Sequence, residues 1–259
     1  MPPSGAAREA PADKSKPACE GRVSMQDSAV AVLEQFGSDI WIAAGPTVAS
    51  LGFRYPTRMA VIRLSDGELF LWSPVAVSPE LRAQIDSLGK VRVLVTPNSL
   101  HHLFLQEWRA ADPDAVLYAA PGSRERCKDI AFDKDLGDEP AQAWAGQIEQ
   151  VPMRGNLLTT EVVFFHRKSG VVLFADLIQH FQPGWFTGWR ALAARLDGMV
   201  AAHPQVPKKF RMAFVDRKAA REGLERILAW PAEKVLMAHA EPVRENGRAF
   251  IERAFQWLR

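Results

Sequence analysis

The feature that most constrains the fold is a set of three short apolar runs. Each run is followed closely by a side chain that can bind a metal. The runs and the residues after them are Val91–Val95 with His101 and His102, 171–175 with Asp176, and 235–238 with His239. Short β-branched runs of this kind predict buried strands. Residues just past strand ends gather along one rim of a sheet, where binding groups usually lie. The sequence therefore predicts a metal site at a sheet rim, without naming a substrate.

The composition is that of a soluble globular protein. The chain has 259 residues, of which 47% are hydrophobic, and eight Trp, enough for a substantial core. Its net charge of +2 gives no reason to expect nucleic acid or an anionic membrane as a partner. Cys19 and Cys127 form no CxxC pair and no disulfide framework, so we expect a cytoplasmic protein. No stretch approaches the roughly 20 apolar residues of a membrane helix, and we expect no integral membrane segment.

The chain divides into a tail and one domain. Residues 1–24 are rich in Pro, Ala, Lys and Ser and lack periodicity, which predicts a disordered N-terminal tail. Residues 25–259 carry the patterned sequence and form the predicted domain. The region 123–150 within it is polar and irregular, and we interpret it as a solvated connection rather than a calcium loop, because the alternation of an EF-hand loop is missing.

Predicted strands and helices alternate along the domain. The expected strands are 40–43, 59–64, 69–72, 91–95, 116–119, 148–151, 162–165, 171–174 and 235–238, and the expected helices are 79–88, 103–111, 191–202, 219–230 and 247–258. The first three strands predict an antiparallel meander. Ser78 is a predicted N-cap before Pro79, and Gly89 ends that helix. Alternation of this kind indicates a layered α/β fold.

Four side chains are the candidate metal ligands that the residues themselves suggest: His101, His102, Asp176 and His239. A catalytic zinc usually has three protein ligands and one position left for water. His101 and His102 are neighbours on a predicted helix and so point different ways; they would approach one metal or two from different angles, or one would pack while the other is solvated. Asp176 ends a buried run, so its carboxylate must be hydrogen-bonded, paired or metal-bound. Glu161 is a further candidate ligand, or else an ordinary exposed strand start.

Other residues near the predicted rim have weaker claims. His180 follows Asp176 by four residues and would share its face in a helix, as a ligand, a proton shuttle or, by preference, a surface residue. His166 and His203 are expected to be solvated. Arg54 or Arg58 could receive a carboxylate or phosphate of a substrate, although surface ion pairing is the commoner role.

An aromatic stretch, residues 181–189 with Trp185 at its centre, follows the predicted Asp176 position. It would act as a lid over the rim, as a peripheral membrane or partner contact, or as a loop packed on the core. Packing is the commonest role of aromatic residues at this density. As a lid, the stretch would favour a small-molecule substrate with an apolar portion, contacted by Trp185.

The order of these features resembles the metallo-β-lactamase superfamily over about residues 30–258. The shared features are the meander, the T-x-x-S-x-H-H turn at 96–102, the strand-end Asp176 and the late segment 238–241. Longer strings are similar to an uncharacterised family of that fold, known only as a domain of unknown function; they lie at 45–47, 55–59, 96–104, 136–140, 161–167 and 246–250. The resemblance implies an αββα sandwich of two mixed β-sheets flanked by helices.

The first metal motif departs from the superfamily pattern T-H-x-H-x-D-H. Pro97 and Ser99 stand where its first two His belong, His101 stands in place of its Asp, and His102 matches its last His. The mid-chain His of the pattern is absent from residues 155–160. The resemblance thus implies that the ligands of a first metal are lost, while those of a second are kept or exchanged.

Two functions follow from this partial match. In the first, one divalent metal, with zinc ranked ahead of iron or manganese, binds to His101, His102, Asp176 and His239, helped by Glu161. Asp176 would then orient a metal-bound water toward an ester, thioester, lactone, amide or phosphodiester. In the second, the altered motif binds no metal, and the fold serves as a ligand-binding or regulatory protein. Redox chemistry with two irons ranks third, because it would require the full His-rich set.

Overall fold

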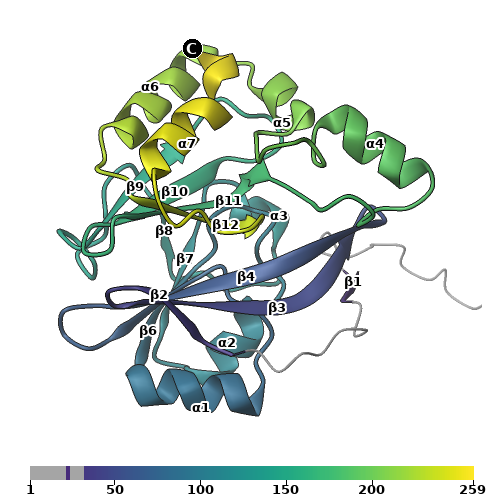
Figure 1. Ribbon diagram of the computed structural model, residues 1–259. Coiled ribbons are helices and arrows are strands. Elements are labelled where there is room, and N and C mark those ends of the chain that lie inside the picture. Colours follow the sequence, from purple (N-terminus) through teal and green to yellow (C-terminus); the bar gives the residue numbers. More distant parts are fainter. Residues whose placement is uncertain (1–21, 24–31) are drawn as a thin grey trace, which may run out of the picture.

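Two β-sheets pack face to face, with helices on both outer sides. The computed structural model of the chain describes residues 22–23 and 32–259. The helices α6 and α7 cover one sheet, and α1 and α2 cover the other (Figure 1). This arrangement confirms the predicted αββα sandwich of two mixed sheets. Within the described residues, no helix is both long and apolar enough to span a bilayer.

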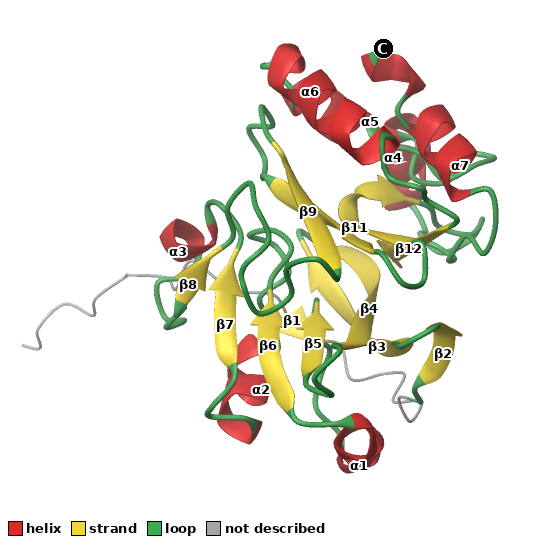
Figure 2. Cartoon of the chain, turned by 90° about the vertical axis from the view of Figure 1, so that its left-hand side faces the viewer, coloured by secondary structure: helices red, strands yellow, loops and turns green. Residues whose placement is uncertain are grey.

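The first sheet has eight strands. In spatial order they are β1 (Arg22–Val23), β3 (Ile40–Ser50), β4 (Phe53–Arg63), β5 (Leu69–Trp72), β6 (Val91–Val95), β7 (Val116–Ala119) and β8 (Lys134–Asp135), with β2 (Glu34–Gly37) also paired to β3. The antiparallel pairing of β3, β4 and β5 confirms the meander. From β5 to β8 the pairing is parallel, and three of these strands, β6 to β8, run side by side in Figure 2.

The second sheet has four strands. Their order is β12 (Lys234–His239), β11 (Val171–Gln179), β10 (Glu161–His166) and β9 (Ile148–Met153). β11 pairs in parallel with β12 and antiparallel with β10. The helices of the fold are α1 (Pro79–Leu88), α2 (Leu105–Ala111), α3 (Ser123–Arg126), α4 (Trp189–Asp197), α5 (Lys208–Ala213), α6 (Arg217–Leu228), α7 (Gly247–Ala254) and the 3-10 turn Gln256–Leu258. As predicted, α1 begins after Ser78, whose hydroxyl accepts the Leu81 N–H, and ends at Gly89.

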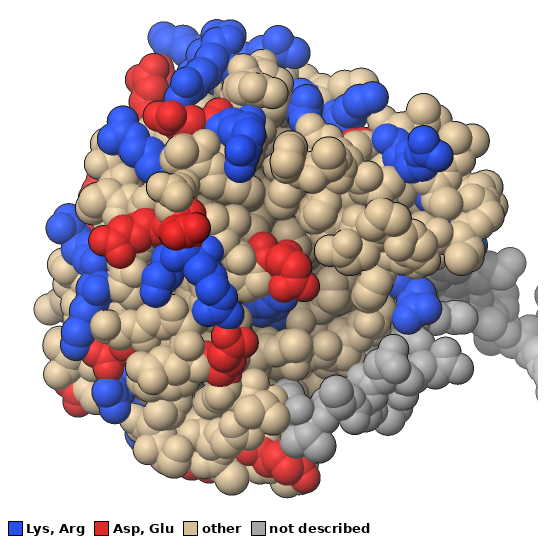
Figure 3. All heavy atoms as spheres, in the orientation of Figure 1, with Lys and Arg blue, Asp and Glu red and all other residues tan. Residues whose placement is uncertain are grey.

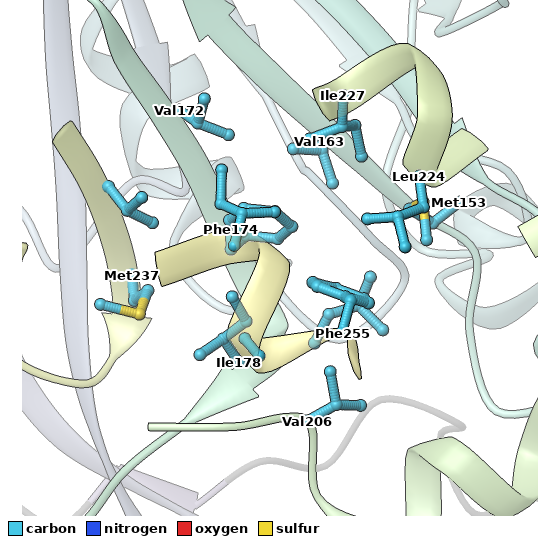
Figure 4. Close-up of a cluster of buried hydrophobic side chains, with 14 of the residues drawn as sticks. Met153, Val163, Val172, Phe174, Ile178, Val206, Leu224, Ile227, Met237 and Phe255 are labelled. Carbon is cyan, nitrogen blue, oxygen red and sulfur yellow. The ribbon is translucent and has the colours of Figure 1, made fainter. Parts of the chain in front are cut away.

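Apolar side chains fill three layers. Phe70 of the first sheet meets Phe164 of the second in the central layer, with ring centroids 5.7 Å apart. Beneath α6 and α7, Phe174 packs against Phe255 (Figure 4). Leu81 and other residues of α1 and α2 cover the outer face of the first sheet. Burying each such side chain stabilises the fold by about 1.5–3 kcal/mol, so the two sheets are held at a fixed separation.

Two expectations about the fold differ from the structure. The region 123–150 is not merely a solvated connection, because Trp144 in it is fully buried against Phe70 and Tyr118, where it closes one side of the central layer. His166 is not solvated either: it is 3% exposed, and its Nδ1 lies 2.7 Å from the Ser169 hydroxyl. The predicted tail lies outside the described residues, except for Arg22–Val23, which pair with β3.

Candidate metal centre

Three separate segments bring His101, Asp176 and His239 together at the rim between the two sheets. His101 follows β6 of the first sheet, whereas Asp176 lies in β11 and His239 ends β12 of the second. One ligand atom from each lies within 4.8 Å of the others. The Nε2 atom of His101 is 3.2 Å from Asp176 Oδ2, and that of His239 is 3.4 Å from Oδ1. The chain thus supplies two imidazoles and a carboxylate facing one point.

A turn after β6, held by hydrogen bonds within residues 96–101, directs His101 into this group. The Thr96 hydroxyl contacts the carbonyls of Asn98 and His101, at 2.6 and 3.0 Å. Asn98 accepts the Leu100 N–H through its side-chain oxygen, at 2.8 Å. The Nδ1 atom of His101 is then 2.7 Å from the hydroxyl of Ser73, just beyond β5. These bonds leave Nε2 of His101 as the atom that faces Asp176.

Asp176 lies inside β11 rather than after its strand, which corrects the prediction from the apolar run. The pairing of β11 with β12 is irregular between Phe174 and Gln179, and Asp176 falls within that irregularity. Its carboxylate accepts bonds from the side-chain amides of Asn98, at 2.9 Å, and Gln179, at 3.2 Å. Burial raises the pKa of Asp176, but the adjacent imidazoles of His101 and His239 outweigh it and hold that pKa well below its usual value.

The orientation of His239 requires a proton or a metal cation between its ring and Asp176. Its Nδ1–H donates to the Pro56 carbonyl oxygen at 2.7 Å, so a neutral ring carries a lone pair on Nε2. That lone pair faces Asp176 Oδ1 at 3.4 Å. Two acceptors face each other favourably only if a proton or a metal cation lies between them. The guanidinium of Arg58 donates to the carbonyls of Met237 and Ala240 and fixes this end of β12.

Glu161 holds the backbone of β11 around Asp176. It is fully buried at the start of β10, not an exposed strand start. Its carboxylate accepts the backbone N–H groups of Ala175, Asp176 and Leu177, at 2.8, 2.7 and 3.1 Å. Burial, and then the charge of Asp176, raise the pKa of Glu161 to about 7 despite these bonds. Its oxygens are engaged with the backbone of β11, and it lies outside the His–Asp–His group.

The structure does not bring His102 or His180 into the group. His102 turns away from its neighbour His101, and its Nδ1 lies 3.1 Å from the Ser99 carbonyl oxygen. His180 follows a strand, not a helix, so it does not share a face with Asp176, and its Nε2 lies 2.9 Å from the Ala201 carbonyl oxygen.

Aromatic residues form one wall beside the group. Tyr55 packs on His239, with ring centroids 5.3 Å apart, and on Phe181, at 5.7 Å. Trp185 donates its indole N–H to the Arg54 carbonyl at 2.9 Å, and the Arg54 guanidinium lies 5.8 Å from the Trp185 ring centroid. The stretch 181–189 is therefore packed at Phe181, as its composition favoured, while Arg54 and Trp185 stand together at its outer edge.

Sequence reasoning missed the residues that hold the group in place. These are Asn98, Gln179, Ser73 and Pro56. Only Asn98, in the turn that carries the His pair, had a usable signal. Three buried polar atoms nearby or in the same turn have no partner among the described residues: Gln179 Oε1, Trp72 Nε1 and His102 Nε2. Buried polar atoms normally have a partner, so a bound water or ion suits at least Gln179, whose amide touches Asp176.

Comparisons with known proteins identify a family and a fold for this chain. A family model described as "Domain of unknown function (DUF4336)" matches residues 47–185, and no curated protein matches. The DIM-1 metallo-β-lactamase exposed to ceftazidime has 15% identity and a TM-score of 0.61, over 90% of this chain and all of that one. The FIM-1 metallo-β-lactamase from Pseudomonas aeruginosa, in its mono-zinc form, has 13% identity and a TM-score of 0.59, over 88% of this chain and 94% of that one.

A third similar structure is the metal-soaked Flv1 flavodiiron core from Synechocystis. It has 13% identity and a TM-score of 0.60, over 88% of this chain and 60% of that one. At these identities the likeness establishes the fold alone, which is the metallo-β-lactamase fold.

Proposed function

Because this chain belongs to the DUF4336 family of domains of unknown function and has the metallo-β-lactamase fold, we propose that it is a metal-dependent hydrolase. One divalent cation would be held by His101, Asp176 and His239. The observation that carries this proposal is the lone pair of His239 directed at the ionised Asp176, since a cation between them stabilises both.

The surroundings of the three residues fit a metal site. Metal-binding His residues usually donate their second nitrogen to a fixed acceptor, as His239 does to the Pro56 carbonyl. Two imidazoles and one carboxylate form a catalytic zinc set, which leaves a position open. We therefore rank zinc first, ahead of iron and manganese. When bound, such a cation supplies Lewis-acid activation of water.

The chain's own residues would orient the reaction. The amides of Asn98 and Gln179 hold Asp176 in one rotation, so one carboxylate oxygen faces each imidazole. The wall of Tyr55 and Phe181 offers apolar contact to a substrate, and Arg54 at its edge offers a charge for an acidic group. The candidate substrates are esters, thioesters, lactones, amides and phosphodiesters.

Two observations support a second candidate function, a ligand-binding or regulatory protein without catalysis. Asp176 already has two amide donors, and a protonated His239 would complete its partners without any metal. The motif residues Pro97 and Ser99 also offer no replacement for the imidazoles they displace.

Metal content decides between the two. Elemental mass spectrometry on protein purified without chelator should find about one zinc per chain. The His239→Ala and Asp176→Asn variants should lose that metal, whereas His102→Gln, which changes the adjacent imidazole outside the group, should keep it. A metal-free wild-type protein even after incubation with zinc, iron or manganese would reject the hydrolase. Metal lost only in His102→Gln would reject the ligand set.

A further inference from the structure

Helix α4 exposes a stripe of large apolar side chains. Trp189, Leu192 and Leu196 are 63%, 62% and 63% exposed. Their spacing of three and four residues places them on one face of the helix, and Ala194 on another face is fully buried. Single exposed apolar residues are ordinary, but three on one face of a nine-residue helix form a surface that a water-facing helix does not need.

The tip of the β3–β4 hairpin extends this stripe. Leu51 at the tip is 95% exposed. Phe53 packs edge-on to Trp189, with ring centroids 5.8 Å apart, and the Arg190 guanidinium lies so close to Gly52 that a Cβ there would be 2.9 Å from it. The hairpin tip and α4 therefore lie together at one end of the molecule (Figure 1). We call Leu51, Trp189, Leu192 and Leu196 the α4 surface.

Basic residues outnumber acidic residues in the segment that carries α4. Residues 177–215 hold five Lys or Arg and one Asp, a net charge of +4, whereas the whole chain carries +2. The single acid, Asp197, is turned to α5, where it accepts the Lys209 N–H at 2.7 Å and pairs with its ammonium at 3.6 Å. In Figure 3 this right-hand end shows tan and blue atoms, and acidic side chains gather on the other half.

We propose that the α4 surface docks onto an anionic phospholipid bilayer. Exposed Trp and Leu side chains can enter the boundary between headgroups and acyl chains, while Arg190 and Arg195 stay at the headgroup phosphates. Each Arg or Lys close to such a membrane adds to the attraction. The whole-chain charge of +2 does not reveal this, because it averages a basic end with an acidic remainder.

The charge distribution favours lipid over a second copy of the chain. A twofold contact through the α4 surface would place Arg190 and Arg195 of one copy against the same basic end of the other. Like charges brought together in this way oppose association, whereas an anionic bilayer neutralises them. Helix α4 has nine residues, too few to span a bilayer, so the contact is peripheral. Docking depends on this surface alone and does not require the proposed metal or hydrolysis.

Vesicle binding tests the proposal. The full-length protein is sedimented with vesicles of phosphatidylcholine alone, and with vesicles in which one lipid in three is phosphatidylserine. We expect binding to the anionic vesicles that weakens as salt is raised. The double variant Leu192→Ser/Leu196→Ser should bind about tenfold more weakly, and Arg195→Glu should also reduce binding.

A matched control removes as much exposed apolar surface elsewhere. Leu157 and Leu158 are 76% and 51% exposed and lie outside residues 177–215. The variant Leu157→Ser/Leu158→Ser should bind anionic vesicles within about twofold of the wild type. Equal weakening in the control and α4 variants would overturn the proposal. So would equal binding to both vesicle types, or a dimer in solution that the α4 variant abolishes while vesicle binding is absent.

Discussion

The buried carboxylate of Glu161 should make the stability of the metal-free protein depend on pH, and the Glu161→Gln variant isolates that contribution. Burial and the charge of Asp176 raise the pKa of Glu161 from an ordinary 4.5 to about 7 in the folded protein. Between these two values the unfolded chain has released a proton that the native state still holds. The free energy of unfolding therefore falls as the pH rises through this window.

The magnitude follows from the two pKa values. Their separation corresponds to about 3 kcal/mol of stability that is present below the lower value and lost above the higher one. Gln carries no charge, but its amide nitrogen cannot accept one of the backbone N–H groups of β11 that the carboxylate serves, at a cost of about 1–3 kcal/mol at every pH. The variant should thus be less stable near pH 5 and as stable as the wild type, or more so, near pH 8.

Urea denaturation of both proteins after chelator treatment measures this difference from about pH 5 to about pH 8. Asp176 stays ionised throughout, because its pKa lies well below this range. The stability difference between the two proteins should change by about 2.5 kcal/mol over the range, so that their curves approach or cross. Curves that stay parallel would refute the reasoning, because Glu161 would then titrate alike in the folded and unfolded states.

Two further predictions concern His166, which is buried, and Arg58, which is half-buried. Burial lowers the pKa of His166 from 6.5 to about 4, so the unfolded chain takes up a proton first as the pH falls. The free energy of unfolding of the wild type should therefore fall by about 3 kcal/mol between these two pH values. The His166→Leu variant should lack this loss, as urea denaturation across the same pH range would measure. Arg58→Met removes the donors to the end of β12, which should cost about 1.5–3 kcal/mol in urea denaturation and weaken zinc binding through His239 in a zinc titration. Arg54→Met, on the exposed side of the same strand, should change stability by less than about 0.5 kcal/mol, and an equal loss would contradict the assigned role of Arg58.

Local sequence patterns predicted most of the secondary structure because strands and helix ends are local signals. The predicted strands at 91–95 and 116–119 coincide with β6 and β7, since each is a β-branched run bounded by turns. The predicted helix 191–202 was too long at its C-terminus. Gly198 takes a left-handed conformation, with φ 81°, and ends α4 after Asp197. The sequence placed Asp176 after a strand because an ionised side chain usually ends a buried run. In the folded protein Asn98 and Gln179 donate to its carboxylate, so it lies inside β11.

The candidate site was predicted in part. His101, Asp176 and His239 were expected as ligands, and the structure brings them together, although their binding of a metal is a proposal. Which of the adjacent imidazoles, His101 or His102, faces Asp176 depends on the turn tied by Asn98. Periodicity along the chain could not decide that choice.

The sequence by itself determined the layered α/β architecture and which residues are chemically able to bind a metal, because apolar runs and turn residues act over a few neighbouring positions. The tertiary structure alone decided three things: that Nε2 of His239 faces Asp176, that Glu161 is completely buried, and that the hairpin tip with Leu51 lies beside α4. Each of these depends on segments far apart in the chain, and on the removal of water between them. Desolvation and distance exist only after the two sheets have packed.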